Sequence, residues 1–155
     1  MESLFSFNMK FKKIQIPKEI RQKWIDALRS GDFKQTSGAL RDRNKYCCLG
    51  VLCELEGIDL TRKFSEENKF VEIGSMCYPW DLRDIEDVQV PKWIRCGSAV
   101  SATHMKVALE NGDHKTYNKF VTVGTFLQLL AEYNDQGRSF HDISNLIENL
   151  TTESI

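Results

Sequence analysis

The sequence lacks a strong net charge and any long apolar segment. Its 21 basic residues are balanced by 22 acidic ones, for a formal net charge of −1. A protein that holds nucleic acid through bulk positive charge is therefore not expected. No apolar run approaches the length of about 18 residues that a membrane-spanning helix needs. The stretch from Met1 to Phe7 has neither the cationic start nor the long apolar core of a signal peptide. We expect a cytoplasmic protein with no membrane partner.

The sequence also lacks the cysteine spacing of a zinc site. Its five cysteines include no Cys-x-x-Cys pair, and two neighbours cannot easily face one tetrahedral ion. They lie in apolar contexts, which indicates reduced, small core residues. We expect neither a metal nor a cofactor. These residues are Cys47, Cys48, Cys53, Cys77 and Cys96.

The length of 155 residues is typical of one domain with a real hydrophobic core. No internal repeat or linker divides the chain, so we expect a single domain over residues 1–155. The two ends, residues 1–8 and 151–155, carry little that would hold them and are expected to be loosely ordered.

The least polar stretch, Tyr46 to Gly57, predicts a buried central helix. Cys48, Leu52 and Leu55 follow the i, i+4, i+7 spacing of one helical face, and the neighbouring residues are apolar as well. Gly50, in the middle, costs about 1 kcal/mol of helix propensity relative to alanine. We expect another segment of backbone to pack against Gly50 and offset this cost.

Other helices are predicted at both ends of the chain. Pro17 opens a helix over 17–30, with Trp24 in its buried stripe. Alternation over 10–16 favours a short edge strand before it. Near the C-terminus, apolar spacing predicts a helix over 123–132, and Ser139 is the expected N-cap of another that ends near residue 150. These two form a helical hairpin.

The middle of the chain predicts a small antiparallel sheet. Asn111-Gly112 is the preferred pair for a type I′ turn, which places strands at about 104–109 and 114–120. A further short strand is expected near residues 70–73. The predicted fold class is therefore α+β, with N-terminal helices, a small central antiparallel sheet and a C-terminal helical hairpin packed on the central helix.

Two stretches of the chain resemble a family of small phage and prophage proteins, most of them without assigned function. One is residues 24–35 followed by Cys-Cys-Leu-Gly-Val-Leu-Cys at 47–53, and the other is residues 130–143, with Asn-Asp-x-Gly-x-Ser-Phe at 134–140. The resemblance implies an accessory phage protein in the cytoplasm of the bacterial host. Such proteins often act against host defence. It carries over no catalytic residue.

A candidate anion site lies at the start of the central helix. Helix N-termini attract anions, and polar and basic residues precede this one. Tyr46 and Trp80 are aromatic residues that could stack on a base. The alternative is an ordinary charged loop, and a turn between two helices already accounts for Asn134 and Asp135. The full set of candidate ligand-binding residues is Ser37, Arg41, Arg43, Lys45, Tyr46, Cys47, Trp80, Asn134 and Asp135.

Cys47 is the one candidate for a catalytic residue. A thiol in the first turn of a helix has a lowered pKa, and His104, His114 or His141 could act as its base. The simpler interpretation is that Cys47 is a core residue, as buried cysteines commonly are. We therefore assign no catalytic residue. Cys47 would be the catalytic residue only if the protein is an enzyme.

Three functions remain open from the sequence. The preferred one is a non-catalytic protein that binds and sequesters a small nucleotide-like signal. The second is an inhibitor that masks a host defence protein, through Tyr78, Trp80 and the acidic stretch 81–87. The third is a cysteine-dependent hydrolase. A homo-oligomer is compatible with all three.

Overall fold

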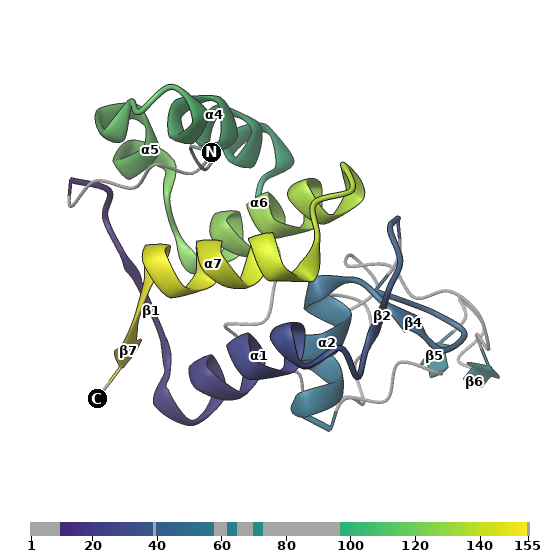
Figure 1. The fold of residues 1–155 in the computed structure, drawn as a ribbon. Helices are drawn as coiled ribbons and strands as arrows, with labels where there is room; N and C mark the ends of the chain where they lie inside the picture. Colours follow the sequence, from purple (N-terminus) through teal and green to yellow (C-terminus); the bar gives the residue numbers. More distant parts are fainter. Residues whose placement is uncertain (1–9, 39, 58–61, 65–69, 73–96, 155) are drawn as a thin grey trace.

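The computed structural model describes residues 10–38, 40–57, 62–64, 70–72 and 97–154 (Figure 1). For residues 62–64 and 70–72 it describes the backbone alone. The helices are α1 (Lys18–Ser30), α2 (Cys48–Leu55), α4 (Ala99–Glu110), α5 (His114–Phe120), α6 (Val123–Asp135) and α7 (Phe140–Leu150). The strands are β1 (Ile14–Pro17), β2 (Lys34–Gln35), β3 (Arg41–Asp42), β4 (Lys45–Tyr46), β5 (Arg62–Phe64), β6 (Phe70–Glu72) and β7 (Thr151–Ser154).

The fold is α+β, as predicted. Short strands form three small sheets: a parallel pair β1–β7, a three-stranded sheet in the order β2–β4–β3, and an antiparallel pair β5–β6. Within the three-stranded sheet, β2 runs parallel and β3 antiparallel to β4. No helix among the described residues is long and apolar enough to cross a bilayer.

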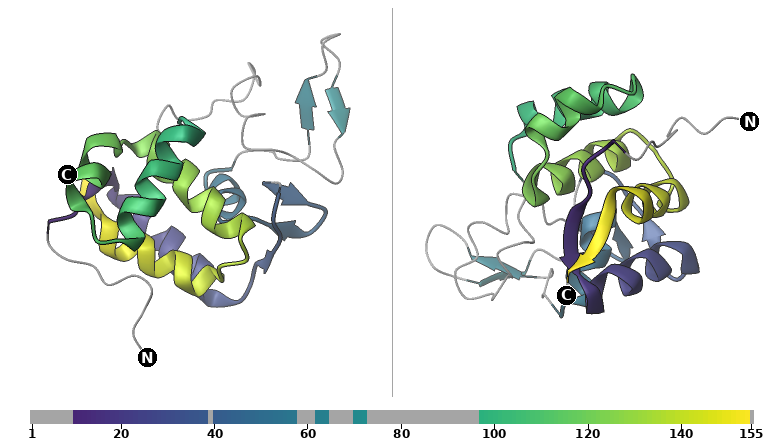
Figure 2. Two further views of the ribbon diagram at one scale, coloured as in Figure 1. Left: turned by 90° about the horizontal axis from the view of Figure 1, so that it is seen from above. Right: turned by 90° about the vertical axis from the view of Figure 1, so that its left-hand side faces the viewer.

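The helices pack in layers around α6 and α7. Figure 1 shows α4 and α5 on one side of this pair and α1 and α2 on the other. The view from the left in Figure 2 shows β1 and β7 side by side along one edge of the helices. The β2–β4–β3 sheet lies beside α2, away from α4.

The core centres on α2 and confirms its prediction as a buried helix. Residues Cys48 to Cys53 are all buried, and Cys47 is only 3% exposed. Trp24, on α1, is fully buried and its indole Nε1 donates a hydrogen bond of 2.9 Å to the carbonyl of Cys48. The predicted role of Trp24 as a core anchor is therefore confirmed, and its indole ties α1 to the first turn of α2.

Gly50 packs against backbone, as its cost in helix propensity suggested. A Cβ atom built on Gly50 would lie 1.8 Å from the carbonyl oxygen of Leu40. That oxygen also accepts a hydrogen bond of 3.1 Å from the N–H of Cys47, and Leu40 is fully buried. Glycine is required at position 50 because the chain before α2 passes directly over this turn.

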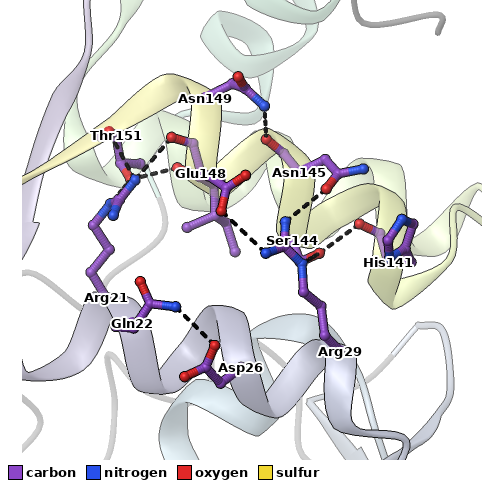
Figure 3. Close-up of polar contacts among 11 residues, drawn as sticks. Arg21, Gln22, Asp26, Arg29, His141, Ser144, Asn145, Glu148, Asn149 and Thr151 are labelled. Atoms are coloured by element: carbon purple, nitrogen blue, oxygen red, sulfur yellow. Dashed lines mark hydrogen bonds and ion pairs between the residues drawn. The ribbon is translucent and has the colours of Figure 1, made fainter.

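Two arginines of α1 bind it to α7 and β7 (Figure 3). Arg21 donates from Nε to the Thr151 hydroxyl and from Nη2 to the carbonyl of Glu148. Arg29 donates to the side chains of Ser144, Asn145 and Glu148. Charged donors make these bonds stronger than neutral ones. They hold the two ends of the chain together.

The predicted hairpin across residues 104–120 is wrong. Ala102, Met105 and Leu109 are buried on one face of helix α4, with the i, i+3, i+7 spacing of a helix. Gly112, at φ 72°, follows the C-cap Asn111, and the Asp113 side chain then caps α5 by accepting from Thr116 N–H. Asn111 and Gly112 do form a turn, but this turn joins two helices and not two strands.

The prediction of loose ends is also corrected at the C-terminus. Residues 151–154 form β7 in register with β1, from Ile14 opposite Thr151 to Pro17 opposite Ser154. The expected edge strand near 10–16 is confirmed as β1, and the short strand near 70–73 as β6. The predicted C-terminal helical hairpin is present as α6 and α7, with Ser139 as the N-cap of α7.

We predict that Gly50→Ala destabilises the fold by about 3 kcal/mol or more. Overpacking a core costs about 1–3 kcal/mol, and here the clash is with a backbone oxygen that cannot rotate away. Chemical denaturation measures the change. Ser101→Ala, in the solvent-facing first turn of α4, is the control. A variant that unfolds like wild type would mean that the Leu40 segment does not pack on Gly50.

Candidate functional site

The segment before α2 folds into a small sheet that presents basic side chains. Strands β3 and β4 are joined by a two-residue turn, Arg43-Asn44, and β2 pairs with β4 on its other side. Arg43 has a φ of 58°, which side chains other than glycine adopt at a cost. Its carbonyl accepts a hydrogen bond of 2.6 Å from Arg41 Nε, which holds the turn in place.

Four cations gather on this sheet, and we call them the basic patch: Lys34, Arg41, Arg43 and Lys45. Lys34 and Lys45 are direct partners in the β2–β4 register, and both are exposed. Like charges placed side by side on a sheet destabilise it. Within the part of the chain that the structure describes, no ion pair neutralises any of the four cations. On its other side Lys45 is the register partner of Asp42, so the patch is a positive surface with one carboxylate beside it.

Tyr46 is positioned as a support for the patch. Its ring is half-buried, meets Phe33 edge-on at 5.3 Å between centroids, and lies under the Arg41 guanidinium at 5.3 Å. One face of the ring is thus already in use by a cation–π contact. Stacking of a base on Tyr46, as the sequence suggested, would have to displace Arg41.

Asn134 and Asp135 clamp this segment from α6. The buried Asn134 Oδ1 accepts from the N–H of Cys48 and from Gln35 Nε2, and its Nδ2 donates to the carbonyl of Thr36. Asp135 Oδ1 accepts from the N–H of Gly38 at 2.7 Å. The sequence placed both residues in a candidate ligand site. The structure gives Asn134 three hydrogen bonds to other parts of the protein, so Asn134 fixes the loop.

The start of α2 is buried, and two of its backbone N–H groups have acceptors within the protein. The N–H of Cys48 is taken by Asn134, and the N–H of Gly50 donates to Cys47 Sγ at 3.4 Å. Cys47, Cys48 and Leu49 are all buried. The first residues of α2 are therefore buried, whereas Lys34, Arg43 and Lys45 are exposed on the neighbouring sheet.

The predicted site residues are thus partly brought together. Arg41, Arg43, Lys45 and Tyr46 share one sheet, and the exposed Ser37 lies in the loop that Asn134 and Asp135 hold. Trp80 lies outside the described residues. Sequence reasoning missed Lys34, whose place beside Lys45 depends on a parallel pairing of two-residue strands. It also missed Gln35, which bridges Asn134 and the carbonyl of Arg138.

Cys47 lies in the core and not in an open site. It is the N-cap of α2, and the Sγ atom serves as the capping acceptor. Of the candidate bases, His104 stacks on Phe120 in the α4–α5 layer, and His114 begins α5. Figure 1 places that layer across α6 from α2. This arrangement favours the interpretation of Cys47 as a core residue.

Comparison with known proteins gives a family and no function. A family model described as "Domain of unknown function (DUF8296)" matches residues 16–151. No curated protein and no solved structure matches the chain.

We predict that Asn134→Ala destabilises the fold by about 2–4 kcal/mol. The change removes three hydrogen bonds and leaves a buried N–H on Cys48 without its acceptor. Asn111→Ala, at an exposed helix end, is the matched control and should be near neutral. Urea unfolding of both variants makes the comparison. Equal midpoints would show that Asn134 does not clamp the loop.

We predict that native Cys47 reacts slowly with iodoacetamide. Burial blocks the reagent, and only an accessible thiolate of low pKa reacts fast. Protein is labelled before and after unfolding in urea, and tandem mass spectrometry then assigns the label within the peptide that holds Cys47, Cys48 and Cys53. Rapid stoichiometric labelling of Cys47 in the folded protein at about pH 6 would instead support the hypothesis that the protein is a cysteine-dependent hydrolase.

Proposed function

We propose that this chain, which belongs to the DUF8296 family, is a non-catalytic binding protein for a small anionic ligand. The proposed ligand is a nucleotide-like signal, which the protein binds and sequesters. The proposed setting is the cytoplasm of a bacterial host, where a phage-encoded accessory protein of this kind would counter host defence. The resemblance of its sequence motifs to phage proteins supports this setting.

The observation that carries the proposal is the basic patch. Two of its lysines are held side by side in register, and Arg43 occupies a left-handed turn position. Each of these features costs stability in the free protein. A multiply charged anion would relieve the repulsion between the cations and would gain charge-assisted hydrogen bonds from arginine.

The scaffold beneath the patch suits binding without large rearrangement. The sheet is tied to α6 through Asn134 and Asp135 and to α2 through Leu40. A surface that is already in position loses less conformational freedom when a ligand binds. Because Tyr46 is covered by Arg41, we propose that the phosphates of the ligand, and not its base, provide most of the affinity.

A second candidate function uses the same surface. An unneutralised patch of four cations also fits an acidic face of a host defence protein, because complementary charges set partner choice. The acidic stretch 81–87 and Trp80, which the sequence suggested for such masking, lie outside the described residues.

We predict that the triple variant Lys34→Gln, Arg43→Gln and Lys45→Gln weakens ligand binding by about 2–4 kcal/mol, with little change in stability. The figure takes about 1.5–3 kcal/mol for each charged hydrogen bond and discounts it for solvent exposure. Arg41 is left in place because it packs on Tyr46. The control triple variant, Lys13→Gln, Lys18→Gln and Lys23→Gln, removes the same charge from exposed positions outside the patch.

Native mass spectrometry of protein purified from infected cells provides the measurement. We expect a small molecule retained by wild type and by the control, and lost from the patch variant. A host protein retained in the same pattern would favour masking over sequestration. Equal retention by all three proteins would contradict a role for the patch.

A further inference from the structure

Helix α4 leaves on the surface a stripe without lysine, arginine or carboxylate side chains. Figures 1 and 2 show α4 apart from the β2–β4–β3 sheet. Ala102, Met105, Ala108 and Leu109 face the core, and the opposite face carries Val100, Thr103, His104 and Val107, which we call the α4 stripe. Val100 is 69% exposed and Val107 is 52% exposed. They are the large hydrophobic residues that the described chain exposes most.

The two sides of the stripe carry opposite charge. On one side Thr103 and Glu110 reach α6, where Thr103 Oγ1 contacts Glu132 Oε1 at 3.5 Å and the Tyr133 hydroxyl donates to Glu110 at 3.1 Å. Lys106 lies on this side too, 3.9 Å from Glu110, so two carboxylates face one lysine. We call Glu110 and Glu132 the acidic flank.

The other side of the stripe adjoins α5 and is basic. His104 stacks on Phe120 at 5.2 Å between ring centroids, and Lys119 lies over the same Phe120 ring at 5.6 Å. Lys115, one helical turn before Lys119, is exposed as well. We call Lys115 and Lys119 the basic flank. The α4 stripe, with Val100 and Val107 along it, thus separates an acidic flank from a basic one.

We propose that the α4 stripe is the contact surface of a homodimer, in which two copies of α4 lie parallel along a two-fold axis. The spacing of seven residues between Val100 and Val107 is the heptad spacing of a parallel helix pair, so each valine meets its own copy in the partner. Such an interface is isologous, as in most symmetric dimers.

Charge selects the parallel arrangement over the antiparallel one. A two-fold axis along α4 places the basic flank of each copy against the acidic flank of the other. An axis across α4 would instead place acidic against acidic and basic against basic. Complementary charge fixes the register of an interface in this way, while like charges disfavour it. The contact area of one helix and its flanks is small, so the dimer is expected to be weak.

The dimer does not depend on the proposed function. The β2–β4–β3 sheet that carries the basic patch lies away from α4 in Figures 1 and 2, so the patch stays accessible in each copy of the dimer. Variants of the stripe should therefore leave ligand retention unchanged, and variants of the basic patch should leave the dimer unchanged.

Sedimentation equilibrium of the full chain, at concentrations up to about 0.5 mM, tests the dimer, because a weak complex has a dissociation constant in the micromolar range or above. We expect a concentration-dependent dimer in wild type. The double variant Val100→Glu and Val107→Glu should weaken it by at least about tenfold, since it places like charges in the centre of the contact. Glutamate forms helices at least as well as valine, so α4 should persist, and circular dichroism confirms that.

The control for charge is Lys18→Gln with Lys23→Gln, which lowers the net charge by the same two units on α1. It should dimerise like wild type. A wild-type protein that stays monomeric over this range would overturn the proposal. So would a dimer that the α4 variant forms as well as wild type.

Two further variants test the parallel arrangement. Lys115→Gln with Lys119→Gln should weaken a parallel dimer, because it removes the attraction to the acidic flank of the partner, whereas it should tighten an antiparallel one. Val100→Cys should form a disulfide-linked dimer under mild oxidation, which wild type should not. In an antiparallel pair, position 100 of one copy would instead face position 107 of the other. A Val100→Cys protein that forms a disulfide only when it is mixed with the Val107→Cys protein would therefore overturn the parallel geometry.

Discussion

The contact between Gly50 and the carbonyl of Leu40 is the constraint on which much of the structure depends. It brings the chain before α2 directly onto the buried helix, closer than any side chain would allow. Once Leu40 is held there, β3 and β4 must turn back outside the core, and their side chains become a surface. The buried helix α2 and the basic patch are therefore two consequences of one packing contact.

Asn134 completes this arrangement from the opposite side. One amide side chain satisfies the first N–H of α2, the side chain of Gln35 and the carbonyl of Thr36. A buried polar network of this kind is stabilising only when every member has a partner. The two motifs at 47–53 and 134–140 thus meet in space, because Cys48 belongs to one and Asn134 to the other. Their conspicuous residues maintain the fold, and the ligand-binding role that we propose lies in the charged residues between them.

Sequence alone predicted the helices in which apolar residues recur at a clear helical spacing. The apolar stripe around Trp24 and the spacing of Cys48, Leu52 and Leu55 correctly predicted α1 and α2, and Gly50 correctly predicted a close backbone contact. The hairpin prediction failed because Asn111-Gly112 ends a helix as readily as it turns a hairpin, and the helical spacing in α4 was given too little weight. Strand β7 could not be predicted, since its partner β1 is more than 130 residues away and each has only four residues. For the site, the cations were found, but their neighbours Asn134 and Cys47 were assigned to the ligand because a sequence does not show which polar atoms are already paired.

The central claim is that the protein recognises an anion with the β2–β4–β3 surface and not with the buried start of α2. Amide chemical shifts, followed by NMR during a titration with inorganic triphosphate, test this most directly. The account predicts shifts at residues 34–46, unchanged signals at Cys48 to Gly50, and no response in the triple variant of the basic patch. Shifts that centre on Cys48 to Gly50, or a wild-type spectrum that triphosphate leaves unchanged, would contradict it.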